Sequence, residues 1–384
     1  MRKRPASAHM RCLDRGTGPP TIARPGIQNT MNCAIIGLPQ SGKSTLFAAA
    51  TGLAPAPGQM PQVRRAAVPV PDCRLKPLAK VFASKKITHA NIEFTDFPGF
   101  SLADAHGRDQ FRRYLPDIRS TDCLVVVVRA FESDEVPTYR NRVDPSADLD
   151  DVWEELVFGD LETVTHRVEK LEAGLKKPTR HDDEKRELAV LQRCQEALEN
   201  ERPISTVLDE ITDAAGLLSH FPFLTEKPLI VVYNVSEDRA ADVDPPAPAH
   251  ARAVVSLCAE LEAEMARLEE ADRAAFLADL GLEAPARERL IHACHDALGY
   301  ITFLTAGPTE ARAWSIPKGF TAVEAAGRIH TDLARGFIRA EVMTVSDLLR
   351  LGSEREVKAH NLMRQEPKDY VVGDEDILHI RFSV

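Results

Sequence analysis

The chain contains 384 residues, of which 44% are apolar, and its formal net charge at pH 7 is −10. A chain of this length is too long for one compact core, so we expect two or three domains. The apolar runs are shorter than the roughly 20 residues of a membrane span. The negative charge argues against nucleic acid covering the whole protein, while leaving room for a local basic face. We therefore expect a soluble protein without a membrane partner.

The cysteines and the N-terminal segment bear on the compartment. Seven scattered cysteines without a Cys-x-x-Cys pair are typical of a reduced, cytoplasmic protein with neither disulfides nor a zinc site. Residues 1–30 hold six Arg or Lys residues and a single acid, Asp14, and lack the apolar stretch of a secretory signal. A mitochondrial transit peptide fits this composition, but we favour a disordered extension, or an upstream start codon for a protein that functionally begins at Met31.

Residues 37–45 read Gly-Leu-Pro-Gln-Ser-Gly-Lys-Ser-Thr and fit the phosphate-binding pattern Gly-x4-Gly-Lys-[Ser/Thr]. A short apolar run precedes them and a helix-forming run follows, which is the context that the pattern requires. The two glycines let main-chain N–H groups turn toward an anion. Lys43 is expected at the β- and γ-phosphates and the Ser44 hydroxyl at Mg²⁺. The predicted phosphate contacts are Gly37, Pro39, Gln40, Ser41, Gly42, Lys43, Ser44 and Thr45.

A second strand, residues 90–95, ends at Asp96-Phe-Pro-Gly99. About fifty residues after a phosphate loop, this Asp-x-x-Gly pattern predicts that Asp96 joins the Mg²⁺ shell and that the Gly99 N–H contacts the γ-phosphate. Ras-like GTPases follow this glycine with a Gln that orients the attacking water. Here the residue is Phe100, which cannot hydrogen-bond water, so hydrolysis needs another group.

Residues 144–207 have a different pattern, because apolar residues recur at three- and four-residue steps among many charges. A polar break at 176–183 separates two amphipathic arms, which predicts an antiparallel helical hairpin. Two roles fit such a hairpin: a solvated spacer, or a docking arm for a large partner.

The α/β pattern resumes with strands at 229–233 and 253–256. We therefore expect a doubly wound, mostly parallel P-loop sheet that the hairpin interrupts, with its ligand at the strand ends. From about residue 301, short alternating strands and two helical pieces predict a small α+β module. The expected organisation is a disordered extension (1–30), a discontinuous nucleotide domain (31–143 and 208–300), a helical coiled-coil insertion (144–207) and the C-terminal module (301–384).

The base-recognition segment departs from that of GTP-specific proteins. Those proteins use Asn-Lys-x-Asp, in which the acid binds guanine and the Lys stem covers the ring. This chain carries Asn234-Val235-Ser-Glu237. The guanine clamp is incomplete at two of its positions, although a longer acid leaves GTP as an alternative ligand.

These motifs resemble those of the YchF/Obg-like ATPases, the branch of Obg-type P-loop proteins that carries Asn-x-x-Glu. The likeness extends from Met31 to Val384 and includes residues 37–47, the Val-Pro-Val-Pro-Asp segment at 68–72, and Gly-Phe-Ile-Arg-Ala-Glu-Val at 336–342. It implies an Obg-type nucleotide domain and a C-terminal, ubiquitin-like TGS domain.

The resemblance also implies a function. It implies ATP binding with Mg²⁺, slow hydrolysis to ADP, and association with ribosomal RNA and proteins through the TGS and helical domains. The adenine would lie at Asn234, Val235 and Glu237, and the main chain of Ser256, Leu257 and Cys258 would complete the base pocket. We expect a monomer.

Departures from the family bear on catalysis. The switch-I Thr of the family aligns with Met60, and a His tied to hydrolysis aligns with Val126. His106 in the altered switch-II loop is a candidate water-positioning residue, although a lone loop histidine is more often simply solvated. We therefore expect nucleotide binding with weak turnover, as a slow ATPase or as a nucleotide-dependent scaffold. A P-loop metabolite kinase fits less well, because Asn234 and Glu237 belong to the GTPase-like branch.

Overall fold

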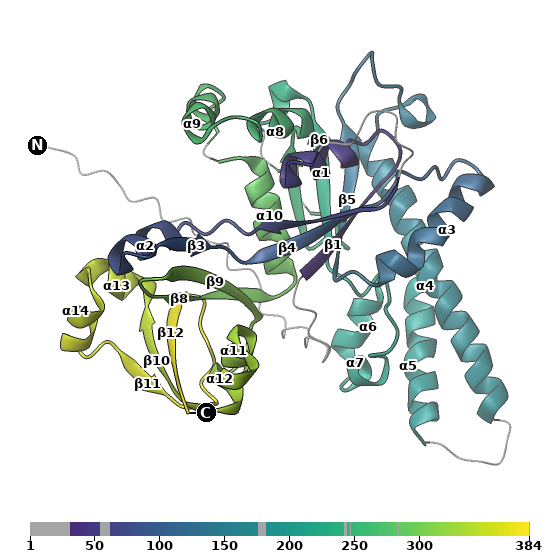
Figure 1. Ribbon diagram of the computed structural model, residues 1–384. Coiled ribbons are helices and arrows are strands. Elements are labelled where there is room, and N and C mark those ends of the chain that lie inside the picture. Colours follow the sequence, from purple (N-terminus) through teal and green to yellow (C-terminus); the bar gives the residue numbers. More distant parts are fainter. Residues whose placement is uncertain are drawn as a thin grey trace, which may run out of the picture.

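The computed structural model describes residues 31–53, 62–175, 182–241, 244–245, 247–282 and 284–383. The predictions for residues 1–30 and for Met60 lie outside these ranges. The described residues form two six-stranded sheets, each with helices, and a helical hairpin that projects from the first sheet (Figure 1). None of the described helices is both long and apolar enough to cross a membrane.

The first sheet is doubly wound and mostly parallel, as predicted. Its order is β2-β4-β1-β5-β6-β7, and β2 alone runs antiparallel to its neighbour, β4. The strands are β1 (Met31–Ile36), β2 (Arg64–Pro69), β4 (Asn91–Asp96), β5 (Cys123–Ala130), β6 (Leu229–Val235) and β7 (Ala253–Leu257).

Both faces of this sheet are covered, because successive side chains of β1 and β5 enter two different cores. Ile35 and Val125 pack on the side of α1 and α10, whereas Ile36 and Val126 pack on the side of α3 and α4. The helices of this region are α1 (Lys43–Thr51), α2 (Leu75–Phe82), α3 (Ala105–Arg119), α8 (Ala259–Met265), α9 (Glu270–Asp279) and α10 (Ala286–Ala297), with 3₁₀ turns η1 (Tyr139–Asn141) and η2 (Glu237–Arg239).

The predicted helical hairpin is formed by α4 (Pro145–Leu175) and α5 (Asp182–Glu199). Arg167 on α4 donates two hydrogen bonds, of 2.7 and 2.8 Å, to the Glu187 carboxylate on α5. The first half of α4 lies against β5 and shares its core, so the hairpin is anchored in the nucleotide-binding part of the fold. Two short helices, α6 (Ile204–Glu210) and α7 (Ala214–Leu217), lead back to the sheet.

The second sheet has the order β11-β10-β12-β8-β9-β3. Its edge strand β3 (Lys86–Thr88) comes from the segment predicted to belong to the nucleotide domain and pairs in parallel with β9. The other strands are β8 (Tyr300–Ala306), β9 (Glu310–Pro317), β10 (Phe337–Thr344), β11 (Arg364–Glu366) and β12 (Asp376–Phe382), and the helices are α11 (Ala322–Ile329), α12 (Thr331–Arg335), α13 (Val345–Leu351) and α14 (Glu354–Ala359).

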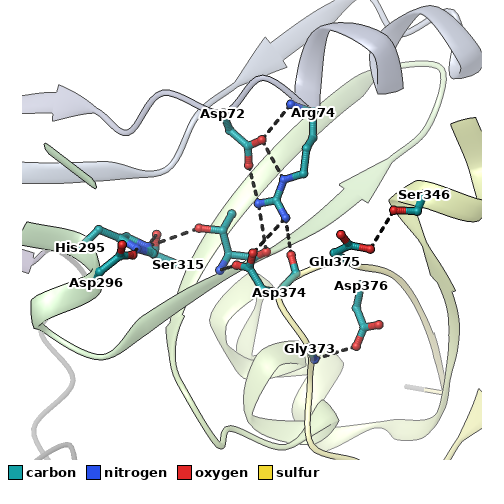
Figure 2. Close-up of polar contacts among 11 residues, drawn as sticks. Asp72, Arg74, His295, Asp296, Ser315, Ser346, Gly373, Asp374, Glu375 and Asp376 are labelled. Atoms are coloured by element: carbon teal, nitrogen blue, oxygen red, sulfur yellow. Dashed lines mark hydrogen bonds and ion pairs between the residues drawn. The ribbon is translucent and has the colours of Figure 1, made fainter. Parts of the chain in front are cut away.

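A polar cluster around Arg74 connects the segment before α2 to the second sheet (Figure 2). Its guanidinium binds the Asp72 carboxylate at 2.7 and 2.9 Å and donates to the main-chain oxygen of Asp374, which precedes β12. Asp374 in turn accepts a 2.7 Å hydrogen bond from the Thr302 N–H on β8. Because Arg74 precedes α2, these contacts tie the start of α2 to the second sheet.

We expect Arg74→Ala to lower the free energy of unfolding by about 2 kcal/mol, because hydrogen bonds to a charged group are lost and Asp72 is left without its counter-ion. The side chain of Arg74 is 22% exposed, which keeps the effect below that of a fully buried pair. Urea unfolding measures the change. Arg335→Ala removes an arginine that is 82% exposed and serves as the control. Equal midpoints for the two variants would contradict the assignment.

Candidate nucleotide-binding site

The loop between β1 and α1 is shaped by two glycines. Gly37 has φ +147°, and a Cβ there would lie 2.4 Å from the Val127 carbonyl oxygen. Gly42 has φ +92°, and a Cβ there would lie 2.0 Å from Nδ2 of Asn234. Only glycine fits either position without displacing its neighbour. The loop therefore closes tightly against β5 and β6 at the carboxyl end of the sheet.

The inner surface of the loop offers hydrogen-bond donors. The N–H groups of residues 43–45, at the start of α1, precede the first helical hydrogen bond, which the Leu46 N–H donates to the Gly42 carbonyl oxygen, and the positive end of the helix dipole lies there. Gln40, Ser44 and Thr45 are exposed, whereas Ser41 is buried. This arrangement suits an anion with several oxygens, such as a polyphosphate.

Lys43 is buried within the loop, with 5% of its surface exposed. Its Nζ donates to the Leu38 carbonyl oxygen at 2.6 Å. Burial lowers the pKa of Lys43 to about 8, and the charge of Asp96 opposes that shift. The ammonium is therefore held in a poorly solvated position, where an added anion interacts strongly with it.

The two residues predicted to bind Mg²⁺ are brought together. The Ser44 hydroxyl donates to Oδ2 of Asp96 at 3.1 Å. Asp96 is 3% exposed, and its Oδ1 is buried without a hydrogen-bond partner among the described residues. A hydroxyl and a carboxylate with a free oxygen are ligands that Mg²⁺ accepts. The donor set therefore fits this ion.

The same carboxylate has a partner that the sequence analysis did not identify. Nη2 of Arg64 lies 2.6 Å from Oδ2 of Asp96. Arg64 and Asp96 are directly opposite each other in the antiparallel pairing of β2 with β4. The signal in the sequence is an arginine in a proline-rich segment, which does not specify that pairing.

Of the residues after Asp96, Gly99 contacts the phosphate loop and Phe100 packs in the hydrophobic core. A Cβ on Gly99 would lie 3.0 Å from Nζ of Lys43 and 3.1 Å from Cα of Pro39, so Gly99 adjoins the phosphate loop. Phe100 is 1% exposed and packs against Phe111, with ring centroids 4.0 Å apart. The position that holds a water-orienting Gln in Ras-like proteins therefore belongs to the core.

The two positions considered for a catalytic histidine, 126 and 106, differ in burial. Val126, aligned with the family's histidine, is fully buried in β5. His106 lies in the first turn of α3 and is exposed. In the described parts of the chain, no hydrogen bond joins His106 to residues 37–45. The structure thus leaves His106 outside the contacts of the phosphate loop.

The base side of the site is built around Asn234 at the end of β6. Its Nδ2 donates to the Ser41 carbonyl oxygen at 3.0 Å, and its Oδ1 accepts from the Ala259 N–H at 2.9 Å. Both ends of the amide are therefore engaged, and Asn234 braces the phosphate loop against the β7–α8 connection. Leu257 pairs with Asn234 in the sheet, which brings the two predicted base-binding segments side by side.

The other predicted base contacts differ in exposure. The side chains of Val235, Ser256, Leu257 and Cys258 are buried, so these residues offer mainly their main chain to a ligand. Glu237 is exposed in η2 and borders a depression of about 670 Å³. The lining of that depression includes Ser236, Asp238, Ala240, Asp279 and Leu280.

Three cysteines that are far apart in the sequence meet in the core. The sulfur atoms of Cys33, Cys123 and Cys294 lie within 4.8 Å of one another, and all three residues are fully buried. Burial raises the pKa of Cys33 well above its usual range. Neutral thiols in such surroundings pack as small apolar side chains. Motif spacing cannot predict this cluster, because β1, β5 and α10 contribute one cysteine each.

The doubly wound sheet, the loop after β1 and the carboxylate at the end of β4 together define a P-loop NTPase fold. The chain is 36% identical to the proteins named "Ribosome-binding ATPase YchF" of Haemophilus ducreyi and Bacillus subtilis, over 92% of this chain and 99% and 100% of those proteins. The chain therefore belongs to the YchF family.

Other comparisons agree with this assignment. The family model described as "50S ribosome-binding GTPase" matches residues 32–155, and the model YchF-GTPase_C, described as "Protein of unknown function (DUF933)", matches residues 300–383. The solved structure of the Schizosaccharomyces pombe YchF GTPase is 26% identical and superposes with a TM-score of 0.77, over 94% of this chain and 100% of that one.

Proposed function

We propose that this protein binds ATP with Mg²⁺, hydrolyses it slowly to ADP, and uses the change as a switch in its association with the ribosome. The arrangement of Lys43, Ser44 and Asp96 at the loop after β1 is the observation that carries the proposal. The relatives named as ribosome-binding ATPases, which match nearly the whole chain, support it.

Each residue of the site has its own role in binding the nucleotide. Main-chain N–H groups of residues 37–45 bind the phosphate oxygens, and Lys43 adds a charge-assisted bond. Ser44 and Asp96 would hold Mg²⁺, which when bound neutralises charge on the β- and γ-phosphates. Asn234 keeps the loop closed, so the donors are in place before the ligand arrives.

ATP is the proposed ligand rather than GTP, because the Lys that would cover a guanine ring is replaced by Val235, a buried residue. The acid at position 237 is a glutamate, which is longer than the aspartate that GTP-specific proteins use. Calorimetric titration with ATP and then GTP tests this choice. Tighter binding of GTP would establish the alternative ligand.

Slow hydrolysis is proposed because a water-orienting group is missing. Phe100 and Val126 are both buried and apolar, and each catalytic group of this kind typically contributes about 10²–10³ in rate. Single-turnover hydrolysis, measured with and without ribosomes, tests the proposal. His106→Ala then shows whether the exposed histidine contributes. No turnover under any condition would favour a nucleotide-dependent scaffold.

We propose that the two appended parts, residues 144–207 and 301–384, carry the ribosome contacts of a cytoplasmic monomer. The hairpin helices α4 and α5 and the strands β8 to β12 of the second sheet support a division into these parts and a nucleotide domain (31–143 and 208–300), although β3 of the second sheet comes from residues 86–88. Sedimentation of lysate on a gradient with ATP or with ADP tests the association. A protein that stays at the top of both gradients would refute it.

The affinity for ATP is expected to fall at alkaline pH. The pKa of Lys43 is about 8, against 10.5 for an unperturbed lysine, because the residue is buried. Below pH 8 the ammonium is already charged. Above pH 8 the free protein must take up a proton on binding, so affinity falls by up to about tenfold per pH unit. Fluorescence titrations of wild type and Lys43→Ala between pH 7 and pH 9.5 test this, and parallel profiles would contradict it.

The same shift predicts an opposite trend in stability. Between about pH 8 and pH 10.5 the unfolded chain holds a proton on Lys43 that the folded chain has released. The contribution of Lys43 to the free energy of unfolding therefore rises with pH across this window and is constant below it. Urea unfolding of the nucleotide-free protein, compared with Lys43→Met, isolates this contribution.

A further inference from the structure

Arg64 lies where the site is expected to bind a metal ion. Its guanidinium lies 2.6 Å from Oδ2 of Asp96, and the same oxygen accepts the hydrogen bond of the Ser44 hydroxyl. The arginine therefore contacts the carboxylate of the Mg²⁺-binding pair itself, at the oxygen that faces Ser44.

Two further contacts hold Arg64 in this position. It pairs directly across from Asp96 in the β2–β4 ladder, which places the two side chains on the same face. Its guanidinium also lies over the Phe47 ring, with Cζ 4.7 Å from the ring centroid. A cation held between a carboxylate and an aromatic face is stabilised from both sides.

Polar atoms remain available on both partners. Nη1 of Arg64 and Oδ1 of Asp96 are buried and have no hydrogen-bond partner within the described ranges. Buried polar atoms normally have such partners. An unpaired guanidinium N–H on a side chain that also contacts Asp96 is a donor of the kind that binds phosphate oxygens well.

The electrostatics of this pair differ from those of an ordinary P-loop site. A buried carboxylate is costly unless a positive charge compensates it. A divalent ion usually provides that charge at a P-loop aspartate. Arg64 provides it permanently, because a guanidinium does not lose its proton at physiological pH.

We propose that Arg64 is a built-in cation of the phosphate site, which neutralises Asp96 and donates to the bound phosphates, so that this chain retains tight nucleotide binding without Mg²⁺. The inference rests on the proposed ATP binding and adds a residue to that site. Added Mg²⁺ then competes with Arg64 for Asp96 and does not create the site.

A purely structural role, as a tie between two strands, makes a different prediction. Loss of such a tie would weaken binding equally with and without Mg²⁺. The neighbouring Arg65 offers a matched control, because it lies on the same strand, is exposed, and pairs with Thr95 in the ladder.

The test is the affinity for a fluorescent ATP analogue, measured in EDTA and in excess Mg²⁺, for wild type, Arg64→Gln and Arg65→Gln. We expect wild type and Arg65→Gln to change by less than about threefold between the two conditions, and Arg64→Gln to lose about tenfold or more in EDTA. Arg64→Lys keeps the charge without the planar fork, and we expect it to fall between them. It also serves if Arg64→Gln does not fold.

Two results would overturn the inference while leaving ATP binding in place. One is a wild-type protein that loses its nucleotide in EDTA. The other is an Arg64→Gln variant whose affinity ratio equals that of wild type. A wild-type protein that binds no nucleotide in either condition would instead refute the proposed function, and the inference with it.

Discussion

Lys43→Ala is expected to weaken ATP binding by about 100-fold or more, because the charge-assisted bonds to the phosphates are lost. The ammonium is buried within the loop, where its Nζ donates to the Leu38 carbonyl oxygen. The fold is expected to persist, since the glycine conformations at Gly37 and Gly42 and the hydrogen bonds of Asn234 remain when the bond from the lysine to Leu38 is lost. Titration with a fluorescent ATP analogue measures the loss.

Lys80→Ala provides the control for this experiment. Lys80 is an exposed lysine on α2, and its loss changes the net charge by the same amount. Thermal unfolding of both variants shows whether the fold is retained. If Lys43→Ala folds normally and binds ATP as tightly as wild type, then the loop after β1 is not the phosphate site.

Asp160→Ala is expected to lower the free energy of unfolding by about 3–5 kcal/mol, the usual cost of breaking a buried ion pair from one side. Asp160 on α4 is fully buried. It pairs with Arg119 of α3 at 2.7 Å and accepts hydrogen bonds from the Leu224 and Thr225 N–H groups at 3.0 and 2.8 Å. The variant leaves the two N–H groups without this acceptor and removes the counter-ion of Arg119, which keeps its hydrogen bonds to main-chain oxygens of Pro222 and Gly159.

Glu162→Ala is the matched control, because Glu162 lies two residues away on the same helix and is exposed. Urea unfolding followed by circular dichroism measures both variants. Because Asp160 connects the hairpin to α3 and to residues 224–225, the loss is also expected to loosen the hairpin against the sheet. Similar unfolding midpoints for the two variants would show that this connection contributes little to stability.

The sequence alone was sufficient for the phosphate loop and the fold class. Residues 37–45 have a local pattern whose spacing specifies a backbone turn, and in the structure Gly37 and Gly42 both adopt positive φ values at that turn. The short apolar run before the loop predicted the strand β1, and helical periodicity predicted the hairpin of α4 and α5. Such features depend on neighbours within a few residues, so local physics determines them.

Only the tertiary structure revealed which side chains, distant in the sequence, contact each other. The pairing of β2 with β4 places Arg64 on Asp96, and β3 completes the second sheet although it precedes that sheet by more than two hundred residues. The brace made by Asn234 likewise joins three separate segments. These contacts depend on strand order and register, which are decided by the burial of whole faces at once and leave no local periodic pattern. The sequence therefore determined the conformation of the loop at residues 37–45, and the packing of the sheet decided that Arg64 contacts Asp96.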